Sequence, residues 1–370
     1  MASVDATKHD RIVFIGDVHG DLLGLVECMR HAQLISCTSE FHTLASACHV
    51  GRGRHRVSQP HLRVDDEGVR WIGGSSCVIL LGDVLDNQRG DDPMGRCALP
   101  GTQQAVLTLL CHLHKAARAH NGRVCLVLGN HEVLNVCASD QTYACNHMFP
   151  SHFLFRGEPQ RLCMPTTGNR LATDERWKKI VLSAVQELQS KAVLLVTKGA
   201  TVLAVCVHGF LHDKTCGAMG LTPLSGTVAE KLEGALANAA LVNRLYDDAL
   251  FRGRGLVYDA IMDRGGSIDA DNLPTWCRAS PSRFLRVPVA ARRYFATQAV
   301  VKGHDIQHGG VPVVHRADGG GVVVFTDVGM SRSMRPPDST SSPVGYVVWK
   351  DGAWQKHAWV VTSWKTIVHD

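Results

Sequence analysis

The chain has 370 residues, of which 45% are hydrophobic and 20% are charged, and its formal net charge is +5 at pH 7. This composition is typical of a globular protein with one large domain or two ordinary ones, and it excludes a disordered tail or a disulfide-stapled miniprotein. No apolar run reaches the roughly 18 residues of a membrane helix, and the polar N-terminus lacks the apolar block of a signal peptide. We therefore expect a soluble, cytoplasmic protein with no membrane partner.

The weak positive charge and the lack of a dense Lys/Arg tract interleaved with aromatic residues predict no dedicated nucleic-acid binding. The unusual counts are 20 histidines and 13 cysteines. The cysteines are scattered and many lie in apolar runs, which is typical of small buried side chains in a reducing compartment. The histidines carry more information, because imidazole is both the commonest metal ligand and an acid/base group near neutral pH.

Short β-branched runs that stop at a glycine predict the buried strands of an α/β sheet. In chain order, the expected strands are residues 11–15, 77–81, 124–128, 192–196, 202–207, 299–302 and 322–325. Apolar residues at helical spacing predict helices, and these cover residues 22–34, 102–119, 183–188 and 228–245. Helices alternate with strands early and strands cluster late, so we expect a mixed α/β sandwich.

Two segments depart from this alternation of strands and helices. From about residue 36 to residue 70 the periodicity is lost and His, Arg, Ser and Gly dominate, which we interpret as a surface insertion. Residues 344–362 read as two strands around the turn residues Asp351 and Gly352, which predicts a C-terminal strand hairpin.

Five of the predicted strands run into loops that carry Asp, Asn or His beside a glycine. The loops are residues 16–20, 82–86, 129–132, 207–209 and 303–305. A pair of divalent cations about 3.5 to 4 Å apart needs a bridging carboxylate and several further oxygen and nitrogen ligands. The five loops together therefore predict a dinuclear metal site. Because its ligands come from both halves of the chain, we expect one catalytic domain over residues 1–370, with a core of about 11–335.

Other catalytic and metal-binding patterns are excluded by the residue types and spacings. A zinc finger fails because the candidate ligands are dispersed and include Asp and Asn instead of thiolates. No Gly-Lys-Ser/Thr follows a glycine-rich turn, as a phosphate-binding P-loop requires. The Gly-x-Ser-x-Gly elbow of the serine hydrolases is also missing.

The loop order, with Gly-Asp-Val-His-Gly first and Gly-Asn-His-Glu third, resembles the calcineurin-like metallophosphoesterases and, within them, the phosphoprotein phosphatase (PPP) family. The finer resemblance is to the Shewanella-like protein phosphatases. The short sequence motifs that carry this resemblance are residues 71–74, 129–135, 140–143, 303–307 and 327–331. The resemblance spans about residues 11 to 335 and implies an α/β fold in four layers, with a central mixed β-sandwich flanked by helices (αββα).

The resemblance also implies a role for each loop residue. The residues that would hold two divalent metal ions are Asp17, His19, Asp83, Asn130, His208 and His304. Asp83 would bridge the two ions, for which manganese is the first expectation and iron or zinc the alternatives. His131 would protonate the leaving alkoxide while Asp86 orients its imidazole, which is the arrangement that in-line attack by an activated water needs.

The phosphate-binding residues depart from the family pattern. The family continues its second loop as Asp-Arg-Gly, whereas here Asp86 is followed by Asn87, and asparagine cannot supply the two-pronged charge of an arginine. Either Arg89 replaces the family arginine from two residues further along, or we expect weaker phosphate binding than in the family. Arg264 corresponds to a second family arginine, and Asn130 completes the predicted phosphate contacts.

The favoured function is a metal-dependent phosphoprotein phosphatase, which cleaves phosphoserine or phosphothreonine, and in a wider reading phosphotyrosine, by direct attack of a metal-bridging hydroxide. Its partner is a phosphorylated protein or peptide. The enzyme alternative is a nucleoside-polyphosphate hydrolase of the diadenosine-tetraphosphatase or cap-cleaving type, with a nucleotide substrate. The loss of the family arginine keeps this alternative open. A third possibility is a non-catalytic member that binds phosphoproteins.

Overall fold

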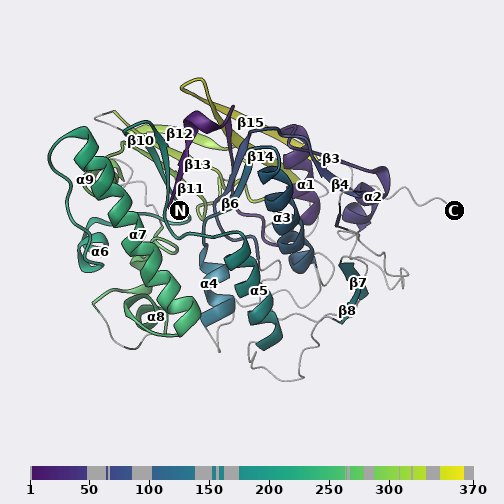
Figure 1. Cartoon of the computed structure of the whole chain (residues 1–370), viewed down its shortest axis with the longest axis horizontal. Coiled ribbons are helices and arrows are strands. Elements are labelled where there is room, and N and C mark those ends of the chain that lie inside the picture. Colours follow the sequence, from purple (N-terminus) through teal and green to yellow (C-terminus); the bar gives the residue numbers. More distant parts are fainter. Residues whose placement is uncertain are drawn as a thin grey trace.

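The residues that the computed structural model describes are 2–47, 64–65, 67–85, 102–137, 152–155, 158–161, 175–262, 264, 267–278, 287–307, 309–317, 320–330 and 342–361. They form two large β-sheets with helices on both outer surfaces (Figure 1). Among the described helices, none is long and apolar enough to cross a membrane.

The first sheet has five strands in the order β15-β14-β2-β5-β6. These strands are β2 (Ile12–Ile15), β5 (Cys77–Leu80), β6 (Arg123–Leu126), β14 (Ser342–Lys350) and β15 (Ala353–Val361). Three of them, β2, β5 and β6, run parallel, whereas β14 pairs antiparallel with β2. Parallel neighbours end at the same edge of a sheet, so the loops that follow β2, β5 and β6 lie side by side.

The second sheet has six strands in the order β1-β9-β10-β11-β13-β12. These strands are β1 (Ser3–Asp5), β9 (Leu194–Lys198), β10 (Thr201–Val207), β11 (Ala299–Lys302), β12 (Val313–Ala317) and β13 (Gly321–Phe325). At its centre β10, β11 and β13 run parallel. The loops after β10 and β11 therefore share one edge as well.

The two sheets pack face to face around an apolar layer. Ile12 and Phe14 of β2 belong to a buried cluster that also contains Cys206 of β10 and Val301 of β11, so side chains from both sheets meet there. Alternate residues such as Val13 point to the opposite face, because successive side chains of a strand leave on opposite sides. Both faces of β2 are buried, which explains its continuous apolar sequence.

Helices cover both outer faces of the sandwich. The helices packed on or beside the five-stranded sheet are α1 (Leu22–His31), α3 (Thr102–Arg118), α4 (Asn130–Cys137) and α5 (Glu175–Glu187). The helices packed on the six-stranded sheet are α7 (Val228–Arg252) and α9 (Val287–Phe295). Figure 1 shows α1 and α3 on one side of the strands and α7 and α9 on the other. The predicted mixed β-sandwich with flanking helices is confirmed.

Local chemistry sets the ends of α7, the longest of these helices. The Thr227 side chain accepts a hydrogen bond from the backbone N–H of Glu230, and the Glu230 carboxylate accepts one from the backbone N–H of Thr227. This reciprocal pair is a capping box, which satisfies two of the N–H groups that a helix start leaves unpaired. Gly253 ends the helix with a left-handed φ of 58°, a conformation that glycine adopts without steric cost.

The shorter elements complete the described chain. They are η1 (Ala6–Lys8), β3 (Ile35–Cys37), α2 (Ser39–Ala47), β4 (Val69–Trp71), β7 (His152–Phe155), β8 (Glu158–Arg161), α6 (Asp213–Ala218), α8 (Leu256–Ile261) and η2 (Ala270–Asn272). Two of the pairs, β3 with β4 and β7 with β8, are small antiparallel sheets.

The interpretation of residues 36–70 as a surface insertion is wrong at both ends. The segment begins in β3, continues into α2 and returns through β4, which pairs with β3. Phe41 and Ala45 lie one helical turn apart on α2 and are buried in the main core. Strands of three residues are too short to show alternation, so their pattern was not visible in the sequence. Residues 48–63 and 66 lie outside the described residues.

The C-terminal strands form the predicted hairpin. β14 and β15 pair antiparallel along their whole length and turn at Asp351 and Gly352, which both have positive φ. Trp354 packs against Phe14, with ring centres 5.5 Å apart, and Trp359 stacks on His31 at 4.0 Å. Trp354 and Trp359 therefore pack the hairpin against β2 and α1.

Candidate metal centre

The loops after five strands bring all six predicted metal ligands to one end of the sandwich. The buried residues that meet there are Asp17 and His19 after β2, Asp83 after β5, Asn130 and His131 at the start of α4, His208 after β10 and His304 after β11. β2, β5 and β6, the strand that precedes α4, belong to the five-stranded sheet, whereas β10 and β11 belong to the six-stranded sheet. The site therefore lies where the ends of both sheets converge.

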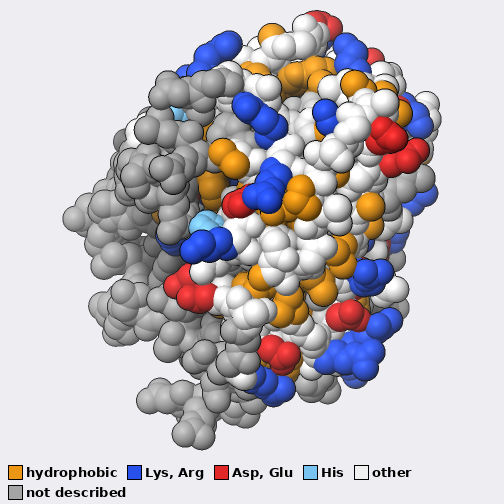
Figure 2. All heavy atoms as spheres, turned by 90° about the vertical axis from the view of Figure 1, so that its left-hand side faces the viewer, with side chains coloured by type: hydrophobic (Ala, Val, Ile, Leu, Met, Phe, Trp, Pro, Cys, Tyr) orange, Lys and Arg blue, Asp and Glu red, His pale blue; other side chains and the backbone are white. Residues whose placement is uncertain are grey.

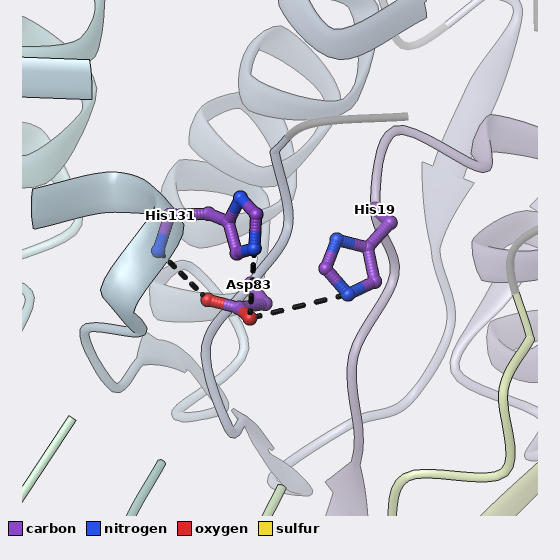
Figure 3. A group of neighbouring side chains, drawn as sticks. All are labelled: His19, Asp83 and His131. Atoms are coloured by element: carbon purple, nitrogen blue, oxygen red, sulfur yellow. Dashed lines mark hydrogen bonds and ion pairs between the residues drawn. The ribbon is translucent and has the colours of Figure 1, made fainter. Parts of the chain in front are cut away.

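Asp83 lies at the middle of this group. Its Oδ2 atom is 3.0 Å from His208 Nε2, 3.8 Å from His131 Nε2 and 3.9 Å from His19 Nε2. Figure 3 shows the His19 ring pointing toward this carboxylate from the loop after β2 and the His131 ring from the start of α4. Oδ1 accepts a hydrogen bond from the backbone N–H of His131 at 3.0 Å, which fixes the carboxylate plane. One carboxylate is thus shared between two groups of possible metal ligands, one with His19 and His131 and one with His208 and His304.

The His208 side fits a divalent cation. The Nδ1 atom of His208 lies 2.6 Å from the carbonyl oxygen of Leu81. Because a carbonyl oxygen only accepts hydrogen bonds, Nδ1 carries the proton. The lone pair of Nε2 therefore faces Asn130 Oδ1 and His304 Nδ1, each 3.1 Å away. Oxygen and nitrogen lone pairs that converge in a buried space need a cation between them, and Asp, Asn and His are donors for manganese, iron and zinc.

The His19 side has the same construction. His19 Nδ1 donates to the Leu85 carbonyl at 3.0 Å, which leaves Nε2 3.9 Å from Asp17 and 3.9 Å from Asp83. The His19 ring meets the His131 ring edge to face at 5.0 Å. A backbone carbonyl that orients a ligating imidazole is a regular feature of metal sites.

The electrostatics of the group also favour a bound cation. Burial, Asp327 and Asp83 raise the pKa of the Asp17 carboxyl well above its usual value. Burial alone would raise the pKa of Asp83 too, but the imidazoles of His208 and His131 hold it well below its usual value. Crowded buried carboxylates are stable as anions only beside a positive charge. A pair of divalent cations would supply that charge.

Two backbone features allow the ligands to approach so closely. His19, Asp83 and His304 all have positive φ, of 44°, 47° and 65°, which is a strained conformation for residues with a side chain. A Cβ atom on Gly129 would overlap the Oδ1 and backbone N atoms of Asp83. Glycine is therefore required before Asn130 for steric reasons, since any side chain there would displace Asp83.

Glu132 supports the site, although sequence reasoning assigned it no role. Its carboxylate is fully buried and accepts backbone N–H hydrogen bonds from Asp83, Val84 and Leu85 at 2.9 to 3.2 Å and from Gly129 at 2.8 Å. Burial, followed by the charge of Asp83, raises its pKa to about 7. One side chain thus clamps the loop after β5 to the loop after β6.

Two charged residues at the candidate metal centre were also missed, one beside His304 and one near Asp17. Arg278 Nη1 donates to the His304 carbonyl at 3.2 Å, while 65% of its side chain stays exposed. Asp327, after β13, is buried, and its charge raises the pKa of Asp17. Asp327 lies in one of the sequence motifs that support the family resemblance. Arg278 lies in none of these motifs and has no distinctive spacing from the other site residues.

Three predicted site residues are not placed at the metal centre. Asp86 and Arg89 lie outside the described residues, so their roles stay predictions. Arg264 is described and exposed, and its guanidinium lies over the Tyr258 ring, 5.1 Å from the ring centre. Its backbone N–H bonds to the Asp259 carbonyl. The predicted phosphate contact of Arg264 also stays a prediction.

Comparison with known proteins agrees with this geometry. Residues 10–210 match the model of the calcineurin-like phosphoesterase family, and this span contains every described candidate ligand except His304. The chain belongs to the calcineurin-like phosphoesterase family. The family predicted from the sequence is thereby confirmed.

Two similar relatives are both named as phosphatases. Shewanella-like protein phosphatase 2 of Arabidopsis thaliana is 30% identical over 129 residues, which is 35% of this chain and 22% of that protein. Shewanella-like protein phosphatase 1 of Plasmodium berghei is 30% identical over 127 residues, or 34% of this chain and 24% of that protein. The chain thus matches about a quarter or less of the length of these relatives.

A solved structure supports the fold over nearly the whole chain. The cold-active protein-tyrosine phosphatase of a psychrophilic Shewanella species superposes with a TM-score of 0.51, covering 98% of this chain and 82% of that one. The identity is 13%, so this likeness concerns the fold alone. The calcineurin-like fold predicted from the sequence is confirmed.

Proposed function

We propose that the protein is a metal-dependent phosphoprotein phosphatase that hydrolyses phosphoserine and phosphothreonine monoesters and extends to phosphotyrosine. The observation that carries the proposal is the Asp83 carboxylate, which two groups of buried histidines share. A bridging carboxylate between two sets of ligands is the arrangement that a dinuclear hydrolase needs. Family membership and the phosphatase names of the relatives support the same reaction.

In this proposal two divalent cations, manganese first and iron or zinc as alternatives, occupy the site. Asp17, His19 and Asp83 would hold one ion. Asp83, Asn130, His208 and His304 would hold the other, since their ligand atoms converge. When bound, the ions neutralise phosphate charge and activate a water molecule for attack.

The remaining steps fall to side chains around the ions. His131 Nε2, 3.8 Å from Asp83, would hold the proton that the leaving alkoxide takes, with Asp86 proposed to orient the ring. The exposed guanidinium of Arg278 beside His304 would contact the phosphate, because a guanidinium can bind two phosphate oxygens at once. Arg278 thereby supplies a cation that Asn87 cannot.

The decisive experiment is a substrate panel with defined metal content. The purified chain, stripped by chelator and reloaded with Mn²⁺, should hydrolyse an aryl phosphate and phosphopeptides, and chelation should abolish turnover. Phosphopeptide turnover well above that of a dinucleotide polyphosphate would support the protein phosphatase. The reverse order would favour the nucleotide hydrolase. Bound Mn²⁺ with no turnover of any ester would leave only the phosphoprotein-binding role.

A single catalytic domain and a cytoplasmic location are part of the same proposal. The metal ligands come from the loops after β2 through β11 and meet at one place, which supports one domain. The described cysteines are free thiols and several, such as Cys77 and Cys206, are buried, which suits a reducing compartment. Among the described residues on the face in Figure 2, Lys and Arg side chains are interspersed with acidic and apolar ones and form no continuous basic stripe. Cell fractionation tests the location.

A further inference from the structure

The end of β11 carries a buried cation outside the predicted ligand set. Lys302 ends β11, and its side chain is fully buried. Its Nζ atom donates to the Gly303 carbonyl at 2.9 Å and to the Asp305 carboxylate at 2.5 Å. A buried ammonium group is costly unless it is paired, and an apolar side chain would fill a strand end at lower cost. Packing alone therefore does not account for Lys302.

Asp305 connects this buried cation to an exposed one. Its Oδ2 atom pairs with Lys302, and its Oδ1 atom lies 3.7 Å from Arg278 Nη1. The same Nη1 atom donates to the carbonyl oxygen of His304. Lys302, Asp305 and Arg278 thus form a row of alternating charges that starts inside the sheet, passes beside His304 and ends at the surface.

The row fixes one of the candidate metal ligands by its backbone. His304 has a left-handed φ of 65°, a conformation that persists only where the surroundings enforce it. Its N–H group points at the Asp17 carboxylate, 3.1 Å from both oxygens, and its carbonyl accepts from Arg278. The Gln307 side chain donates to the Asp305 carbonyl at 2.7 Å and steadies the far end of the turn.

We propose that Lys302 and Asp305 form a positioning pair, which holds the loop of His304 and aims the exposed guanidinium of Arg278 at the substrate phosphate. The inference rests on the proposed phosphatase function, in which Arg278 contacts phosphate. With Oδ2 of Asp305 held by the buried Nζ atom, Oδ1 is left facing the guanidinium. Neither member of the pair needs to touch the substrate.

A double-mutant cycle on phosphate binding tests the pair. The probe is inorganic phosphate, titrated calorimetrically into the Mn²⁺-loaded full chain. Asp305→Asn and Arg278→Ala should each weaken phosphate binding about tenfold. The double variant should bind phosphate at most about twofold more weakly than Arg278→Ala does, because the two substitutions remove the same interaction. Additive losses of about a hundredfold would overturn the positioning role.

Lys302→Met completes the test, since methionine keeps an apolar stem of similar length. This variant should lose phosphate affinity to the same extent as Asp305→Asn, and wild-type affinity would overturn the proposal. If Asp305→Asn fails to fold because it strands a buried ammonium, the Lys302→Met/Asp305→Asn variant, which removes both charges, replaces it in the cycle. Asp248→Asn, which breaks the exposed ion pair with Arg252 on α7, is the matched control and should bind phosphate normally.

Phosphate binding also separates this inference from the proposed function. A protein that binds phosphate with the expected coupling between Arg278 and Asp305, yet hydrolyses no ester, would refute the phosphatase and keep the positioning pair. A wild-type chain that turns over phosphopeptides, in a protein where Arg278 and Asp305 show no coupling, would support the phosphatase and refute the positioning pair. Absence of phosphate binding by the Mn²⁺-loaded wild type would overturn the pair.

Discussion

The Asp83 carboxylate lies 3.0 Å from the Nε2 atom of His208, and this contact joins the ends of two different sheets. Asp83 follows β5 of the five-stranded sheet, and His208 follows β10 of the six-stranded one. The candidate metal centre is therefore complete only when the two sheets pack against each other. Residues in the apolar layer between the sheets, such as Phe14, contribute to the site by setting how its two halves meet.

Asp83→Asn should separate metal binding from folding. Asparagine keeps the Oδ1 acceptor that bonds the His131 N–H group, so the fold should persist. The amide cannot bridge two cations, and activity should fall at least about a hundredfold because several kcal/mol of charge stabilisation are lost. Metal analysis should find fewer than two ions per chain.

The matched control for Asp83→Asn is Glu233→Gln, which removes one exposed negative charge from α7. It should bind metal and turn over substrate as the wild type does. An Asp83→Asn protein with two tightly bound ions and wild-type turnover would contradict the bridging role.

Glu132→Gln should lower both the stability of the fold and the Mn²⁺ affinity of the candidate metal centre. The carboxylate accepts four backbone N–H groups, and in glutamine one oxygen becomes an NH₂ group that faces donors. We expect the free energy of unfolding to fall by about 2–4 kcal/mol, as for a buried charged acceptor that is lost. Since the clamped loop includes Asp83 and Leu85, whose carbonyl orients His19, Mn²⁺ affinity should fall about 10- to 100-fold.

Urea unfolding and metal titration measure the two effects of Glu132→Gln. The exposed Glu233→Gln variant again serves as control and should stay within about 0.5 kcal/mol of the wild type. Unchanged stability together with unchanged metal affinity would show that Glu132 does not clamp the loops.

The convergence of the candidate metal ligands could be predicted from the sequence because their signals are local. Asp17, Asp83 and His304 each stand next to a glycine that ends a β-branched run, and the ends of parallel strands meet at one edge. The spacing along the chain thus specifies where these side chains converge in space.

The supporting residues could not be predicted, because their roles depend on non-local geometry. Glu132 acts on N–H groups of a loop far away in the sequence, and only the pairing of β5 with β6 places them together. Arg278 lies in an irregular segment and meets His304 through a single backbone carbonyl. Phe41 was missed for another reason, since α2 lies among polar residues and its apolar stripe is narrow.

Gly129→Ala should damage the metal centre through sterics alone. The added Cβ would overlap atoms of Asp83 and come within 2.9 Å of a Glu132 oxygen. We expect a loss of about 1–3 kcal/mol in the free energy of unfolding, as for overpacking, and weaker Mn²⁺ binding. The control is Gly309→Ala, where a Cβ meets no described atom within 4 Å. Equal melting temperatures and metal affinities for the two variants would refute the close approach at Gly129.

His114→Asn should make the free energy of unfolding depend less steeply on pH in the acid range. His114 on α3 is buried, its Nδ1 donates to the Val124 carbonyl at 2.7 Å, and its Nε2 has no hydrogen-bond partner among the described residues. Burial lowers the pKa of His114 below 6.5, because a proton on Nε2 would be buried without an acceptor. The unfolded chain therefore binds this proton first. The stability that neutral His114 contributes is present above about pH 6.5 and is lost as the pH falls toward the folded-state pKa.

Asparagine keeps a donor for the Val124 carbonyl but does not titrate. Between pH 7.5 and pH 5.5 the wild type should lose more unfolding free energy than His114→Asn, by up to about 1.4 kcal/mol per pH unit, which is the limit for one group. Urea unfolding at each pH gives the difference. His120→Asn, a change of an exposed histidine after α3, should reproduce the wild-type slope. A wild-type slope in His114→Asn would mean that His114 titrates alike in the folded and unfolded chain.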